Sequence, residues 1–326
     1  MRDSDHIFAH MPDPAEDPQG TIAALRQCLA LEPDDPEYNS TLGLILAQYD
    51  GDLDEALLLA RRAVDLQPEG ALWWEQLGLV HFYRREPDQS LPPLARAEHL
   101  EPGEARHPYN LGTSLLVSGD YPGAAAAFRR ALERDPAYQD AHHNLAVCLL
   151  KLDAPLEARE ALEAALILDG NDVTSLVQLG KLLLGQEEVA AAIPHLVRAV
   201  RLDAHHAMAR MFLGQALAIS GESLAAQQAL SEAVELDPDL FGAWSHLLAL
   251  RLDDGDELGA RSVAAACYEA RPGAITSYNL GALWANLERW NEAELYMQRA
   301  VDEAPHQPTF AEALRQIREL RMQEEN

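Results

Sequence analysis

Basic residues and cysteines are scarce in this chain of 326 residues. Lysine and arginine total 25, against 53 aspartates and glutamates, so the formal net charge is −28. Nucleic-acid binding needs a basic surface, and this composition argues against it. The three cysteines, Cys28, Cys148 and Cys267, are too few and too widely spaced for a disulfide framework or a zinc site. A reducing compartment fits best, and we expect the protein to be cytoplasmic.

Long hydrophobic runs are missing as well. No stretch of 18 apolar residues is free of charge, so we expect no membrane insertion. The first residues lack the apolar core of a signal peptide. Residues 1–17 are acidic and contain Pro12 and Pro14, and we expect them to form a flexible tail.

Motifs that carry catalytic chemistry are not found either. The sequence has no glycine-rich phosphate-binding loop, no nucleophile elbow and no zinc-protease helix. Two histidine doublets, at 142–143 and 205–206, consist of neighbours that point about 100° apart on a helix, so neither doublet chelates a metal alone. We therefore expect no enzyme activity, no cofactor and no metal.

What the chain does have is an internal repeat of about 34 residues. Prolines or small stand-ins recur at Pro33, Pro68, Pro102, Pro136, Gly170, Ala204, Pro238, Pro272 and Pro305. Glycines that each follow a leucine recur at Gly43, Gly78, Gly112, Gly180, Gly214 and Gly281. Small residues lie twelve positions before each member of the first series from Pro68 onward, at Ala56, Ser90, Ala124, Ala158, Ala192, Ala226, Ala260 and Ala293. Within each unit, the apolar residues follow helical spacing. The pattern predicts two helices in each unit, and the small residues allow these two helices to approach closely. One such hairpin cannot bury its own apolar face, and the units must stack.

The sequence resembles tetratricopeptide (TPR) repeats. The best unit, 107–136, has the family pattern at Leu111, Gly112, Leu115, Ala124, Phe128, Ala131 and Pro136. The resemblance implies an all-α fold, a right-handed superhelical α-solenoid of helix hairpins with a C-terminal capping helix. We expect one solenoid over 18–326, with a half repeat at 19–33, a cap helix at 308–324, and repeats at about 36–70, 71–104, 105–138, 139–172, 173–206, 207–240, 241–273 and 274–307. The first repeat has one extra residue, which we place in its turn at 50–54.

The family resemblance also implies a binding surface, because the first helix of each TPR unit lines a concave groove. The inward positions give these candidate partner-binding residues: Arg106, Tyr109, Asn110, Thr113, His143, Asn144, Lys151, Gln178, Lys181, Met208, Met211, Phe212 and Asn279. The only two lysines of the chain are in this set. With Arg106 they would receive carboxylates of the partner, Met211 and Phe212 would receive an apolar side chain, and the asparagine amides would hold a peptide main chain. The simpler interpretation is that these are ordinary solvated residues.

Three functions remain open. The first is a non-catalytic scaffold or adaptor that binds a segment of a protein partner in the groove. The second is a dedicated chaperone for a basic secreted or membrane-bound client, which the acidity would keep soluble. The third is a substrate-recognition subunit that acts in trans for an enzyme such as a glycosyltransferase. The oligomeric state cannot be read from the sequence.

Overall fold

The computed structural model describes residues 3–324, and within that range the chain is helical throughout, without a β-strand. The residues up to Gly170 form one compact unit, and those from Asn171 onward form a second. The continuity of one solenoid over 18–326 stays a prediction.

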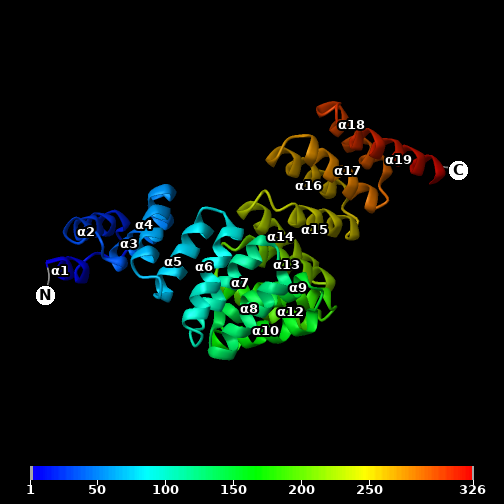
Figure 1. Cartoon of the computed structure of the whole chain (residues 1–326). Helices are drawn as coiled ribbons and strands as arrows, with labels where there is room; N and C mark the ends of the chain where they lie inside the picture. The colour runs from blue at the N-terminus through cyan, green and yellow to red at the C-terminus, as the bar shows by residue number, and fades with distance from the viewer. Residues whose placement is uncertain (1–2, 325–326) are drawn as a thin grey trace. The chain divides into compact units, whose positions relative to one another are not determined.

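The first unit holds helices α1 to α10 (Figure 1). They are α1 (Asp3–Ala9), α2 (Pro18–Leu31), α3 (Pro36–Ile45) with the π-helical η1 (Leu46–Asp50), α4 (Leu53–Leu66), α5 (Ala71–Tyr83), α6 (Pro87–Leu100), α7 (Arg106–Ser118), α8 (Tyr121–Arg134), α9 (Gln139–Lys151) and α10 (Pro155–Leu168). The second unit holds α11 (Val173–Gly185), α12 (Val189–Leu202), α13 (Ala207–Ile219), α14 (Ser223–Leu236), α15 (Phe241–Asp253), α16 (Glu257–Ala270), α17 (Ala274–Asn286), α18 (Trp290–Glu303) and α19 (Pro308–Glu324).

Consecutive helices pack as hairpins, and each predicted repeat holds one hairpin. The predicted all-α solenoid is confirmed. Helix starts follow local chemistry: Asp35, Asp52, Asp120 and Asp172 each accept hydrogen bonds from backbone N–H groups in the first turn of the following helix. Among the helices of residues 3–324, none combines the length and apolar character needed to cross a bilayer.

Small residues let the two helices of a hairpin approach closely. Gly43 on α3 faces the backbone of α4, so a Cβ added to it would lie 2.8 Å from the carbonyl oxygen of Ala56. Gly112 on α7 faces the fully buried ring of Phe128 on α8 in the same way. The alanines of the second helices, such as Ala124, are fully buried. The spacing that predicted the hairpins is therefore the spacing of their contacts.

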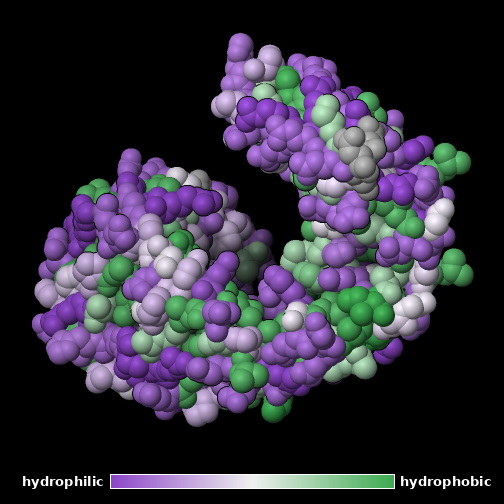
Figure 2. Space-filling model, turned by 90° about the vertical axis from the view of Figure 1, so that its right-hand side faces the viewer, coloured by the Kyte–Doolittle hydropathy of each residue, from purple (hydrophilic) through white to green (hydrophobic). Residues whose placement is uncertain are grey.

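Each unit has its own apolar core. In the first unit, Leu25, Leu42, Leu46 and Val80 belong to one buried cluster. In the second unit, the buried cluster includes Trp284, and its other members run from α13 to α19. The outer surface is mostly hydrophilic on the face seen in Figure 2, where hydrophobic side chains form small separate patches.

The N-terminal segment differs from the expected flexible tail. Residues 3–9 form helix α1, and the Phe8 ring lies 5.2 Å from the ring of Tyr38 on α3. The backbone oxygen of Pro12 accepts a hydrogen bond from Thr21 Oγ1 at 2.9 Å. The predicted half repeat is therefore a hairpin of α1 and α2. Residues 1–2 lie outside the described range.

The extra residue of the first repeat is not in its turn. The turn at 51–52 is as short as the turn at 119–120 of the third repeat. The extra residue instead widens the end of the preceding helix into η1, where Gly51 N donates to the Leu46 oxygen at 2.9 Å. The expected position at 50–54 was wrong by a few residues.

Candidate partner-binding surfaces

The candidate residues of the first unit lie on α7 and α9, next to α5. An ionic cluster with Glu75 and His107 buried at its centre connects α5 to α7. The Glu75 side chain on α5 is 8% exposed and pairs with His107 Nδ1, while Arg106 Nε lies 3.4 Å from Glu75 Oε2. Glu101 contacts both partners, at 3.3 Å from His107 Nε2 and 3.8 Å from Arg106 Nη2. Arg106 is therefore engaged within the chain, whereas we expected it to receive a carboxylate of the partner.

The charge state of this cluster follows from its surroundings. Burial alone lowers the pKa of His107. The hydrogen bond and the charge of Glu75, together with Glu101, outweigh the burial, and the pKa of His107 lies above its ordinary value. The imidazolium form is therefore stabilised between two carboxylates.

An aromatic and amide cluster lies further along α7. The Tyr109 ring stacks on Tyr138 with the centroids 4.6 Å apart, and it lies 5.8 Å from Phe128. Asn144 Nδ2 donates to the Tyr109 hydroxyl at 3.3 Å, and Thr113 Oγ1 donates to the Tyr109 backbone oxygen at 3.1 Å. The structure thus brings together three residues that the sequence predicted for one surface.

Tyr138 is a member of this cluster that sequence reasoning missed. It lies in the turn before α9, outside the inward positions of the first helices. Burial, with the nearby Tyr109 and the carboxylate of Asp140, raises the pKa of Tyr138 to about 12, so the phenol is neutral at physiological pH. Its position immediately before a first helix is the sequence signal that could have identified it.

The other candidates of the first unit differ in their exposure. Asn110 and His143 are half-buried on α7 and α9. Lys151, the last residue of α9, is exposed and has no ionic partner among the described residues.

In the second unit, Lys181 on α11 and Phe212 on α13 lie together. Lys181 is exposed, and its Nζ lies 5.9 Å from the centroid of the Phe212 ring, a cation–π distance. Gln178 is half-buried one turn away on the same helix. Met208 is 41% exposed. These four residues form a surface with one cation and two apolar side chains.

Two candidates of the second unit lie elsewhere. Met211 is only 7% exposed and belongs to the apolar core, so it is not placed to receive a side chain of the partner. Its sulfur fits beside Gly242, where an added Cβ would lie 3.0 Å away. Asn279 lines a separate cavity of about 450 Å³ with Trp244 and Arg271, near the starts of α15 and α17. The candidates of the second unit therefore do not form one cluster.

Metal sites and reactive thiols both depend on titratable groups. The described side chains form no group of three histidine, cysteine or carboxylate ligands. All three thiols are buried, and burial raises the pKa of Cys148 and Cys267 to about 11. Such thiols are protonated at neutral pH and are poor nucleophiles.

Stacked helix hairpins place the chain in the class of α-helical repeat proteins. The chain belongs to the tetratricopeptide repeat family, which it matches over residues 15–71, 45–105, 109–173 and 177–241. Proteins of this family generally mediate protein–protein interactions.

Two sequence relatives are members of one protein complex. The chain is 28% identical over 148 residues to the BBSome complex member BBS4 of Mus musculus, which covers 45% of this chain and 28% of that protein. It is 28% identical over 158 residues to the BBSome complex member bbs-4 of Caenorhabditis elegans, which covers 48% of this chain and 34% of that protein. The chain thus spans about a third or less of the length of these relatives.

Solved structures show the same fold. Pseudomonas aeruginosa pilF has a TM-score of 0.58 at 19% identity, and the match covers 67% of this chain and 97% of that one. YrrB, described as a TPR protein with an unusual peptide-binding site, has a TM-score of 0.50 at 24% identity, and the match covers 56% of this chain and 95% of that one. At these identities the likeness concerns the fold alone.

Proposed function

We propose that this protein is a non-catalytic scaffold that binds a segment of a protein partner on the first-helix face of its hairpins. Family membership supports the general activity, and the BBS4 relatives are members of a multi-protein complex. The observation that supports the proposed site is that both lysines are exposed and lack an ionic partner among the described residues. Lys151 and Lys181 are exposed on first helices, and neither has a carboxylate partner among the described residues, although the chain has 53 acidic residues.

The two surfaces have complementary chemistry for a peptide. In the first unit, Asn144 and Tyr109 offer an amide and a phenol, and Lys151 offers a positive charge at the end of α9. In the second unit, Lys181 and Phe212 offer a charge beside a ring. Amides pair with a peptide main chain regardless of sequence, and the lysines select carboxylates. Each surface is proposed by itself.

The experiment is affinity capture from a lysate of the source organism, with bound proteins identified by mass spectrometry. Lys151→Glu and Lys181→Glu are compared with the wild type. Arg61→Glu and Arg201→Glu are matched controls, since both arginines are exposed cations of second helices without an ionic partner in the described part of the chain. Circular dichroism establishes that all variants fold.

We expect a partner that the controls retain and that one or both lysine variants lose. Retention of every partner by both lysine variants would refute the proposed surfaces. A partner lost equally from lysine variants and controls would show a dependence on overall charge and not on these surfaces.

The net charge of −28 favours a second function, that of a chaperone for a basic client. This function predicts binding that survives both lysine substitutions and weakens steeply when the salt concentration rises from about 0.1 M to 1 M. We also propose a cytoplasmic location, which the three free, buried thiols support.

A further inference from the structure

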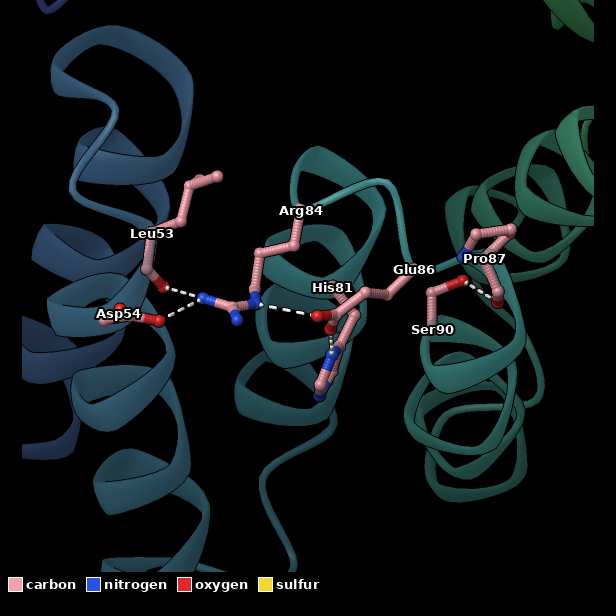
Figure 3. Close-up of polar contacts among 7 residues, drawn as sticks. All are labelled: Leu53, Asp54, His81, Arg84, Glu86, Pro87 and Ser90. Carbon is pink, nitrogen blue, oxygen red and sulfur yellow. Dashed lines mark hydrogen bonds and ion pairs between the residues drawn. The ribbon is translucent and has the colours of Figure 1, made fainter.

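The turn at residues 84–86, between α5 and α6, is rigidly braced (Figure 3). Arg84 Nη1 donates to the backbone oxygen of Leu53 and to Asp54 Oδ1, both at 2.8 Å, and Arg84 Nε lies 3.2 Å from Glu86 Oε1. The other oxygen of Glu86 lies 2.8 Å from His81 Nδ1. These contacts attach the turn to α4 on one side and to α5 on the other. They also engage the nearby charges with one another.

Arg85, in the middle of this turn, has no such contact. Its side chain is exposed and has no hydrogen-bond or ionic partner among the described residues. Its backbone is left-handed, with φ of +61°. The corresponding turns of other repeats need the same conformation, and there the residue is a glycine or an acid: Gly51, Asp153, Gly119, Glu187, Gly221, Gly255 and Glu288. Within residues 3–324, Arg85 is the one cation at this position.

Arg85 borders an apolar cavity of about 390 Å³. Phe82 and Tyr83 at the end of α5, Pro87 at the start of α6 and Val117 near the end of α7 supply the other walls. We call these five residues the turn pocket. Gln48 Nε2 donates to the Tyr83 hydroxyl at 2.8 Å and orients that ring, while Val117 is 60% exposed. A cavity of this size has room for one large side chain and its adjacent backbone.

We propose that the turn pocket is a docking site for a peptide segment of a partner protein in which an aspartate or glutamate stands beside an aromatic or branched apolar side chain. The apolar side chain packs against Phe82, Tyr83 and Val117, and the carboxylate pairs with Arg85. A guanidinium offers a planar pair of donors that matches a carboxylate, and Arg85 is uncommitted within the chain.

The net charge of the chain restricts the other residues of the partner peptide. Because the chain carries a net charge of −28, the residues that flank the single carboxylate are neutral or basic. This site lies at the turn end of the hairpins, where Lys151 ends α9 in the repeat after Val117. Its lining contains neither Lys151 nor the Tyr109 cluster, so its residues are distinct from those proposed above.

The test is selection of a phage-displayed library of random dodecapeptides on the full chain, in parallel for the wild type and for Arg85→Gly. Glycine suits this backbone, as the glycines of the other turns show, so the variant removes the charge without strain. Asp153→Gly is the matched control, because it makes the same backbone change in another turn of the same unit. Val117→Asp places a carboxylate in the pocket at an exposed position.

We expect the wild type to enrich peptides with an acidic residue next to an aromatic or branched one. Their affinity should fall by about tenfold or more for Arg85→Gly and Val117→Asp and stay unchanged for Asp153→Gly. Absence of this motif from the wild-type pool would overturn the proposal. Equal binding of the motif by Arg85→Gly would overturn it too, and a loss with Lys151→Glu alone would assign the motif to the α9 surface.

Discussion

Replacing Gly43 by alanine tests how much the stability of a hairpin depends on the close approach of its two helices. A Cβ at this position would lie 2.8 Å from the Ala56 oxygen and 3.2 Å from the Ala60 nitrogen. Both atoms are backbone, so no side-chain rotation relieves the clash. Helices α3 and α4 must move apart by several tenths of an ångström, and both belong to a packed core.

Two opposing effects set the magnitude. Overpacking a well-packed core costs about 1–3 kcal/mol. Alanine is a better helix former than glycine by about 1 kcal/mol, which offsets part of that cost. We therefore expect Gly43→Ala to lower the free energy of unfolding by up to about 2 kcal/mol. Gly185→Ala is the matched control, because Gly185 is also helical and an added Cβ there meets nothing within 4 Å.

The assay combines urea unfolding, followed by circular dichroism at 222 nm, with amide hydrogen exchange. Exchange is needed because repeats contact mainly their neighbours, and a local defect opens locally. Protection should fall in α3 and α4 of Gly43→Ala, and the midpoint of Gly185→Ala should not fall. A midpoint that rises equally in both variants would refute the reasoning, since propensity would then outweigh the contact.

Three further predictions concern charge and burial. The three thiols should resist iodoacetamide at pH 7.5 in the native protein and react fully in urea, as measured by intact mass. The reason is that burial raises the pKa of each thiol, and it raises the pKa of Cys148 and Cys267 to about 11. The pKa of His107 is raised, so its stabilisation is complete below about pH 6.5 and is lost as the pH rises through its folded-state pKa. Burial lowers the pKa of His246, so its contribution is present above about pH 6.5 and is lost as the pH falls through its folded-state pKa. Hydrogen exchange corrected for intrinsic rates should therefore show α7 gaining and α15 losing protection between pH 7.5 and 5.5, and His107→Gln and His246→Gln should each remove one effect. Glu98 accepts hydrogen bonds from Arg130 and a second arginine of α8, so Glu98→Ala should cost about 1–3 kcal/mol in urea unfolding, and an unchanged midpoint would contradict that role.

The hairpins could be predicted from the sequence because their spacing is set by contacts within each repeat. Gly112 and Ala124 are small since the partner helix occupies the space beside them. Helix α1 could not be predicted in this way. Its seven residues are too few for an isolated helix, and it is stabilised by the contact of Phe8 with Tyr38, which a local pattern does not show.

The site was predictable only in part, because side-chain direction depends on neighbouring helices. Tyr109 and Asn144 meet as their positions in the family pattern imply. Met211 is buried because Gly242 of the next repeat leaves room for its sulfur, and Arg106 is paired because Glu75 of the preceding repeat lies beside it. The family pattern gives the positions that face inward, but it does not give the particular side chain that the neighbouring repeat places beside each of them.

The π-helical end of α3 bears on how such arrays change in length. The extra residue is taken up within residues 46–50, while the turn at 51–52 and the start of α4 keep the form seen in other repeats. An insertion is thus confined to the helix in which it occurred, and the hairpins that follow keep their order of contacts. Deleting one residue of this bulge would restore a spacing of 34. The segment marks a place where evolution or a designer can lengthen a repeat without disturbing the next one.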